Sequence, residues 1–163
     1  MDQKITELAE LTTPAAVDLL AIVDDPSESP ATQKMTLDTL DDYLSATAKT
    51  LTNKRTTLRV TTITSHATPT VNTDNCDVVT ITALAEAIAS MTTNLSGTET
   101  NFQKLIFRIL DNGTARAITW GSAFEARGVD LPTATTISKL LTVGFIYDTV
   151  DSIWGCVALA EEE

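Results

Sequence analysis

The sequence contains few of the residues on which enzymes and nucleic-acid-binding proteins usually depend. It has one histidine, and its 11 Lys and Arg residues stand against 22 Asp and Glu, which gives a net charge of −11. Nucleic-acid binding draws its affinity from Lys and Arg side chains that release counterions from the phosphates. A surface as acidic as this one repels the phosphates. We therefore expect no nucleic-acid partner, and a protein whose charge keeps it soluble until it meets its partners.

Long apolar runs and cysteine motifs are also scarce. No uninterrupted apolar stretch approaches the roughly 18 residues that a membrane-spanning helix needs, and Met1–Glu10 carries charges throughout, unlike a signal peptide. We expect no membrane insertion. Cys76 and Cys156 lie far apart without CxxC spacing and are expected to be two reduced, buried thiols made in a cytosol. A disulfide between them cannot be argued from the sequence.

The motifs of common catalytic sites are missing. The chain has no GxSxG, P-loop, HExxH or GxGxxG pattern. Ser65 and His66 are adjacent, but neighbouring strand residues point to opposite faces and cannot act as nucleophile and base. Glycoside hydrolysis would need two carboxyl groups roughly 5–10 Å apart across a cleft, whereas most acids here lie in expected turns. We expect no enzyme, no catalytic residue and no cofactor.

One acidic stretch has a loose likeness to a calcium loop. Asn72, Asp74 and Asp77 in VNTDNCD place three oxygen-bearing side chains close together. Their spacing misses the EF-hand pattern, and no glycine stands where that loop needs its sharp turn. Asp and Asn side chains that close their own backbone turns explain the pattern better. We therefore expect no metal site.

Threonine is the residue that the sequence has in excess, with 30 of 163 positions. β-branched residues pack well on a pleated surface, so the composition predicts a mainly β protein. Gln103–Leu110 is the clearest strand; Asp111–Gly113 is predicted to be a hairpin turn, with Ala115–Trp120 returning antiparallel. Thr136–Tyr147 and Ile153–Ala160 are predicted to form a second pair. Further strands are expected at 56–62 and 78–84, and a strand or a helical turn at 83–91.

The first fifty residues differ in style from the rest. Asp18–Asp25 (DLLAIVDD) and Thr32–Met35 are predicted to form a hairpin around a loop at 26–30. Thr36 resembles a helix N-cap, followed by a short helix of about two turns that carries Leu37, Leu40 and Leu44. Such a small unit cannot bury a core alone and must dock on something else.

These patterns divide the chain into two parts joined by a linker at 45–55. Residues 1–50 are predicted to form an attachment segment of a β-hairpin and a short helix, and residues 51–163 an antiparallel β-sandwich with a jelly-roll-like arrangement. Contacts with other subunits or with a larger particle are expected on eight apolar residues, for which packing inside the chain itself is the alternative: Ile5, Leu8, Leu11, Leu19, Ile22, Leu37, Leu40 and Leu44. The alternation of the aromatic residues with Ile, Leu and Val favours their burial in the core, and Trp120 and Tyr147 are the candidates for a ligand surface as the alternative.

Two segments resemble proteins of tailed bacteriophages. KITELAELTTPAAVDLLAIVDDPSESPATQKMTLDTL is similar to the opening segment of many phage fibre and minor structural proteins, in which KIT-L--L leads into a D-LL-IVD strand, a loop and a K-T---L strand-to-helix step. The residues that carry this likeness are Lys4, Ile5, Thr6, Leu8, Asp18, Leu19, Ile22, Val23, Asp24, Lys34, Thr36 and Leu40. LTNKRTTLRVTTITSHATPTVNTDN, LIFRILDNGTARAITWGSAFEARGVDLPTATT and VGFIYDTVDSIWGCVALAEEE are similar to a C-terminal β domain of phage structural proteins.

The resemblance implies a virion structural protein, made in the host bacterial cytoplasm and commonly a homotrimer, whose N-terminal segment attaches it to other phage virion proteins of the capsid or tail. The chain lacks the long shaft of a typical tail fibre, which favours a short head or tail fibre or a capsid decoration protein. A receptor- or glycan-binding module of a tail fibre is the alternative, with a host surface glycan or receptor as its partner.

Overall fold

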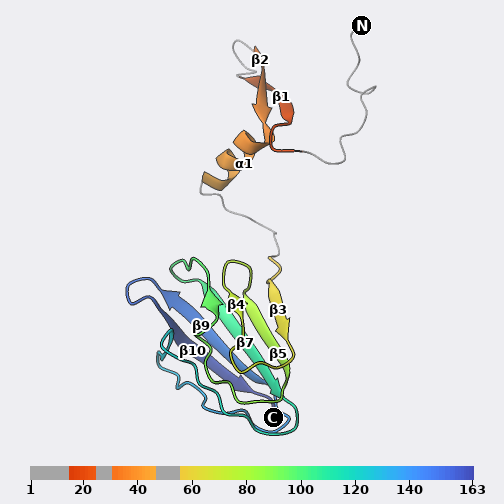
Figure 1. Ribbon diagram of the computed structural model, residues 1–163. Coiled ribbons are helices and arrows are strands. Elements are labelled where there is room, and N and C mark those ends of the chain that lie inside the picture. Colours follow the sequence, from red (N-terminus) through yellow and green to blue (C-terminus); the bar gives the residue numbers. More distant parts are fainter. Residues whose placement is uncertain (1–14, 25–30, 47–55) are drawn as a thin grey trace. The chain divides into compact units, whose positions relative to one another are not determined.

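The computed structural model describes residues 15–24, 31–46 and 56–163 (Figure 1). The chain divides into two compact units, Met1–Arg55 and Thr56–Glu163. In the described residues strands predominate and the single helix lies in the first unit, so the predicted mainly β character is confirmed. The predicted loop at 26–30 and most of the predicted linker lie outside the described residues.

The first unit contains a hairpin and a helix, as predicted. Strand β1 (Leu19–Asp24) pairs antiparallel with β2 (Ala31–Thr36), and helix α1 (Leu37–Ala46) follows directly. The Thr36 hydroxyl accepts a hydrogen bond from the backbone N–H of Thr39 at 3.0 Å, which is the expected N-cap. The helix has ten residues, nearly three turns rather than two. Backbone hydrogen bonds from its first turn to Asp18 and Ala16 hold it against the start of β1.

The second unit is built around a mixed sheet of six strands in the order β3-β5-β7-β9-β10-β8. A separate pair, β4 and β6, lies outside this sheet. The strands are β3 (Val60–Ile63), β4 (Val71–Asn72), β5 (Val78–Leu84), β6 (Leu95–Ser96), β7 (Lys104–Asp111), β8 (Phe124–Ala126), β9 (Leu141–Asp148) and β10 (Ile153–Glu161).

The first half of this unit winds in parallel coils. β3, β5 and β7 are parallel neighbours in the main sheet, and β4 and β6, which lie between them in sequence, pair in parallel with each other. Ile88 and Ile118 extend this pattern with a parallel bridge. The coils therefore have a β-solenoid-like arrangement. Antiparallel pairing throughout was the sequence-based expectation, and it is wrong for the pairs β3–β5, β5–β7 and β8–β10.

The predicted hairpin at Asp111–Gly113 is also wrong. The segment is a turn, because the Asp111 carboxylate accepts the N–H of Gly113 at 2.9 Å and Gly113 has φ +90°. The chain then leaves the sheet, and Ala117 and Ile118 bridge to Ala134 and Ile88 instead of to β7. The strands beside β7 are β5 and β9. Local turn chemistry predicted the turn correctly but not which strand would lie beside β7.

The second predicted pair is confirmed, and the ambiguous segment at 83–91 is resolved. β9 and β10 pair antiparallel, with a bulge between Cys156 and Ala158. Segment 85–91 has no helix. The backbone N–H groups of Ile88 and Met91 donate to the carbonyl oxygens of Ala117 and Thr119, so long-range pairing replaced the helical turn that the alanines favour.

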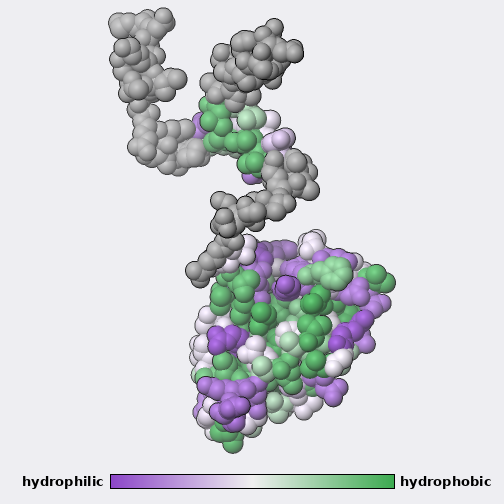
Figure 2. All heavy atoms as spheres, turned by 180° about the vertical axis from the view of Figure 1, so that it is seen from behind, coloured by the Kyte–Doolittle hydropathy of each residue, from purple (hydrophilic) through white to green (hydrophobic). Residues whose placement is uncertain are grey.

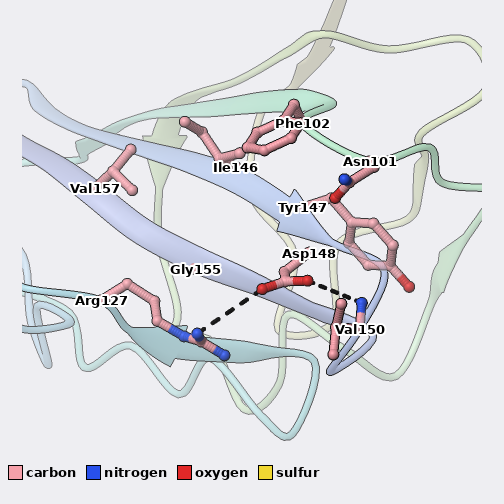
Figure 3. A pocket seen from close by; sticks show the side chains of 9 residues that line it. All are labelled: Asn101, Phe102, Arg127, Ile146, Tyr147, Asp148, Val150, Gly155 and Val157. Atoms are coloured by element: carbon pink, nitrogen blue, oxygen red, sulfur yellow. Dashed lines mark hydrogen bonds and ion pairs between the residues drawn. The ribbon is translucent and has the colours of Figure 1, made fainter.

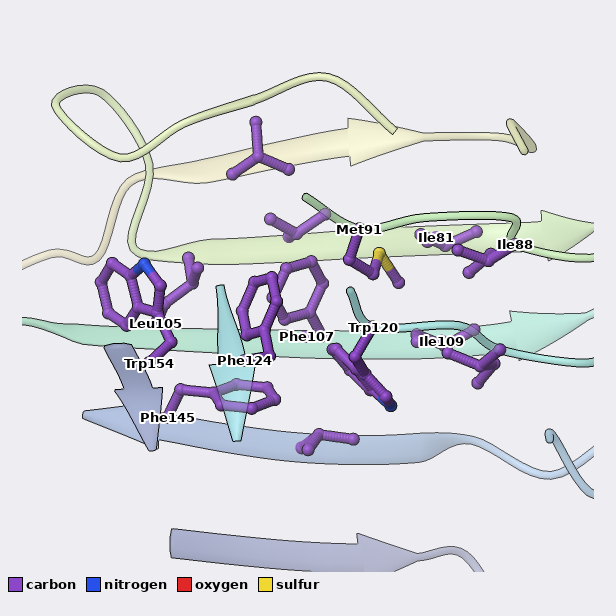
Figure 4. Packing of buried hydrophobic residues seen from close by; sticks show 14 of the residues in the cluster. Ile81, Ile88, Met91, Leu105, Phe107, Ile109, Trp120, Phe124, Phe145 and Trp154 are labelled. Atoms are coloured by element: carbon purple, nitrogen blue, oxygen red, sulfur yellow. The ribbon is translucent and has the colours of Figure 1, made fainter. Parts of the chain in front are cut away.

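The core lies between one face of the main sheet and the connections that cross over it (Figure 4). Phe107 is at its centre, with ring centroids of Trp120, Phe124 and Phe145 at 5.4, 5.8 and 5.9 Å, each in an edge-on orientation. Such pairs add about 0.5–1.5 kcal/mol each beyond the burial of their area. All buried apolar side chains of the described residues belong to the second unit.

Candidate functional site

The two faces of the six-stranded sheet differ in what covers them. In β7, Leu105, Phe107 and Ile109 are fully buried on the core face, while Lys104, Ile106 and Arg108 alternate with them on the other face. None of the latter three belongs to the core cluster. We call this second side of the sheet the outer face. Figure 2 shows one side of the unit, where apolar residues gather in the middle and hydrophilic residues surround them.

Strand register aligns uncharged residues across the outer face. Successive pairs join Val60 to Val78, Val78 to Ile106, Ile106 to Gly144 and Gly144 to Ala158. These five residues, one on each of five neighbouring strands, are named the central row. The rows beside it contain threonines and the two cations Lys104 and Arg108. Threonines 62, 80 and 142 lie there, so part of the threonine excess covers the outer face.

A cleft of about 450 Å³ adjoins the central row (Figure 3). Its lining comes from β9 and β10, from the loop before β7, from the loop between β9 and β10, and from Arg127 beside β8. The residues are Asn101, Phe102, Arg127, Ile146, Tyr147, Asp148, Val150, Gly155 and Val157. Apolar and polar side chains contribute equally, and the polar ones are Asn101, Arg127, Tyr147 and Asp148.

Phe102 is unusual in both exposure and backbone conformation. Its side chain is 73 % exposed, and its φ of +62° lies in the left-handed region that side-chain-bearing residues rarely adopt. The chain on both sides holds it there: Phe102 N–H donates to Tyr147 O at 3.0 Å, and Tyr147 N–H donates to Gln103 O at 2.9 Å. Strained residues of this kind cluster at binding sites. The anchored loop therefore presents an aromatic ring at the edge of the cleft.

Arg127 lies at the opposite side of the cleft among three carboxylates. Its guanidinium is 2.6 Å from Asp151, 3.4 Å from Glu125 and 3.9 Å from Asp148. The hydrogen bond that the guanidinium donates to Asp151, followed by the charge of Glu125, raises the pKa of Arg127. The side-chain stem of Arg127 covers Gly155, where an added Cβ would lie 2.5 Å from Arg127 Cγ. Three negative charges surround one positive charge, so this side of the cleft does not favour an anionic ligand.

The two residues expected to form a ligand surface behave differently from that expectation. Trp120 is only 4 % exposed and donates its indole N–H to Pro132 O at 2.8 Å, so it belongs to the core and not to a ligand surface. Tyr147 does belong to the cleft lining and is half-buried. Its ring packs against Trp154 of the core, with the centroids 5.1 Å apart. Phe102 is the exposed aromatic residue of this site, and no short motif in the sequence points to it.

The polar residues examined for chemistry have ordinary structural roles. Asn72 accepts the backbone N–H of Asp74, and the Asp77 carboxylate binds Arg59, which lowers the pKa of Asp77 through this hydrogen bond. The described residues contain no cluster of metal-ligating side chains. His66 is exposed and accepts the N–H of Thr68, while the Ser65 hydroxyl accepts the N–H of Ala85.

The expected contact residues of the first unit are described only in part. Leu19 is 58 % exposed and Leu44 is 50 % exposed, while Leu37 and Leu40 are half-buried. The backbone of Ile22 lies in β1, and its side chain is outside the described part. Three further candidates also lie outside the described residues: Ile5, Leu8 and Leu11.

Three further findings concern the whole chain. Cys76 and Cys156 are both buried and free, as predicted. Within the described ranges, no helix combines the length and the apolar character that crossing a membrane requires. No known protein family, curated protein or solved structure matches the chain.

Proposed function

We propose that this chain is a non-enzymatic structural protein of a bacteriophage virion, a short head or tail fibre or a capsid decoration protein. Its first unit docks on another phage virion protein, and its second unit, a sandwich-like arrangement of the main sheet against its covering layer, is displayed. The resemblance of both segments to phage structural proteins supports the virion assignment, and it also suggests that the chain associates with itself as a trimer.

The observation that carries this proposal is the exposed apolar surface of the first unit. Val17 is 78 % exposed, Leu19 58 %, Tyr43 59 % and Leu44 50 %. No described side chain of residues 15–46 is buried. A hairpin with one helix cannot bury these side chains. Leaving them in water costs a free energy of about 25 cal/mol for each Å² of exposed apolar surface. Docking on another protein removes that cost, so the unit is suited to attachment.

Incorporation into phage particles tests the proposal. The wild-type chain and the double variant Leu19→Asp/Leu44→Asp are expressed during infection, and purified particles are analysed by immunogold electron microscopy. We expect wild-type chain on the particles and at least a tenfold loss for the double variant, because charges on the docking surface would be buried without partners.

Asp41→Asn, on an exposed position of the same helix, is the matched control and should be incorporated like the wild type. Circular dichroism and tryptophan fluorescence of each variant should match the wild type, because both tryptophans lie in the second unit. Purified particles without the wild-type chain would overturn the proposal.

A further inference from the structure

The outer face of the main sheet has projecting apolar side chains and a recess beside them. Val60, Phe102 and Val157 project from it or beside it, with exposures of 59, 73 and 44 %. The cleft, whose lining includes Phe102 and Val157, lies beside these groups. One copy therefore offers both projecting apolar groups and a recess that can receive such groups.

Strand register places uncharged residues at the centre of this face, where a partner can exclude water without removing a charge from it. The central row contains no charged residue and crosses five strands. Val78 is 8 % exposed although it does not belong to the core cluster, because its neighbours in the row, Val60 and Ile106, flank it on both sides. The row has larger side chains at one end, where Val60, Val78 and Ile106 lie. It has small residues at the other end, where Gly144 and Ala158 lie.

Charge favours a copy of this same chain as the occupant. Lys104 and Arg108 flank the central row, and neither forms an ion pair within the described residues. The chain as a whole has a net charge of −11. Two chains of this charge repel each other over most of their surfaces. The repulsion is weakest where Lys104 and Arg108 are exposed, so electrostatics favour binding of an acidic second copy at the outer face.

The size of the face is also suitable. The five strands have four to nine residues each. With strands about 4.8 Å apart and a rise of about 3.4 Å per residue, they cover roughly 600 Å². A standard protein interface covers about 800 Å² on each partner. The Phe102 loop and the loop of Val150, which is 88 % exposed, extend the surface beyond the strand ends toward that value.

We infer that the outer face of the six-stranded sheet is a contact surface for a second copy of this chain. The central row forms the centre of the contact, and the cleft receives a projecting apolar side chain of the other copy. Lys104 and Arg108 at its rim meet carboxylates of that copy. The inference rests on the self-association included in the proposed function and names the surface that carries it.

Light scattering coupled to size-exclusion chromatography of the full chain tests the inference. We expect the wild type to have a mass of at least twice the 17.5 kDa of one chain, at a whole-number multiple of that value. Ile106→Lys and Val60→Lys each place an ammonium group in the central row, and both should shift the mass to that of the monomer. Val60 is exposed on the edge strand β3, so its substitution leaves the core intact.

Ile137→Lys is the matched control, because Ile137 is 57 % exposed and lies outside the central row. It should retain the oligomer, and all three variants should keep the circular dichroism of the wild type. A monomeric wild type overturns the inference, and so does an oligomer that survives both row variants or one that Ile137→Lys also dissociates. Since attachment to particles is measured separately through the first unit, none of these outcomes decides whether the chain is a virion protein.

Discussion

At the scale of single residues, the second unit is held together by a few polar groups inside an apolar core. Asp111 is the clearest case, with a side chain only 4 % exposed. Its carboxylate accepts hydrogen bonds from Gly113 N–H at 2.9 Å, the Thr135 hydroxyl at 2.8 Å and Ser138 N–H at 3.0 Å. It therefore ties the end of β7 to the connection that precedes β9.

The protonation of Asp111 should make the stability of the unit depend on pH. Burial alone would raise the pKa of Asp111, but the hydrogen bonds from Ser138, Thr135 and Gly113, with the charge of Arg116, outweigh burial and lower it. A carboxyl group whose pKa is lower in the folded protein than in the unfolded chain contributes stability above the unfolded value of about 3.9, and this contribution is lost as pH falls through the folded value.

We predict that Asp111→Asn lowers the free energy of unfolding at pH 7 by about 1–3 kcal/mol, because the amide nitrogen cannot accept these hydrogen bonds. Urea unfolding followed by tryptophan fluorescence at pH 7 and pH 3 measures the effect. The difference between variant and wild type should shrink at pH 3. Asp130→Asn, at an exposed position, should show no loss at either pH. A constant difference between pH 7 and pH 3 would show that the charge of Asp111 does not contribute.

At the scale of elements, local patterns predicted the first unit far better than the second. The pairing of β1 with β2 and the helix that follows depend on neighbours in sequence, because the strand pattern and the Thr36 cap act within a few residues. Parallel coils depend on contacts between distant segments, such as Val78 with Ile106. The alternation of buried and exposed residues in β7 is compatible with parallel and antiparallel neighbours alike, so the sequence could not distinguish them.

The N-cap of α1 provides a test at this scale. Thr36→Ala removes the acceptor of the Thr39 N–H, and we expect it to destabilise the helix by about 1 kcal/mol, while Thr36→Ser should retain most of the effect. Amide hydrogen exchange measured by NMR should therefore become roughly fivefold faster at Thr39 in the alanine variant. Equal exchange rates in the alanine variant and the wild type would show that the cap does not stabilise α1.

At the scale of the whole molecule, the chain joins two units that differ in how far their described apolar side chains are buried. The second unit holds every buried apolar side chain of the described residues, whereas the first leaves Leu19, Leu20 and Leu44 exposed. Phe107 lies at the centre of the core and is fully buried. Stability of the second unit should consequently not depend on side chains of the first.

We predict that Phe107→Ala lowers the free energy of unfolding of the second unit by about 3–5 kcal/mol, because it removes a buried ring and leaves a cavity. Leu19→Asp/Leu44→Asp should change it by less than about 0.5 kcal/mol. Trp120 and Trp154 report on this unit alone, so urea unfolding followed by tryptophan fluorescence separates the two cases. A large loss in the double variant would indicate that the two units unfold together.

The sequence by itself determined the β character, the hairpin with its capped helix, the burial of both cysteines and the apolar strands that became β9 and β10. These follow from composition, periodicity and capping, which act over short distances. Only the tertiary structure decided that β3, β5 and β7 are parallel, that Trp120 is buried while Phe102 is exposed, and that residues 60, 78, 106, 144 and 158 form one row. The physical reason is that register between distant strands, together with the connections that cover one face of the sheet, determines which residues become neighbours and which remain exposed to solvent.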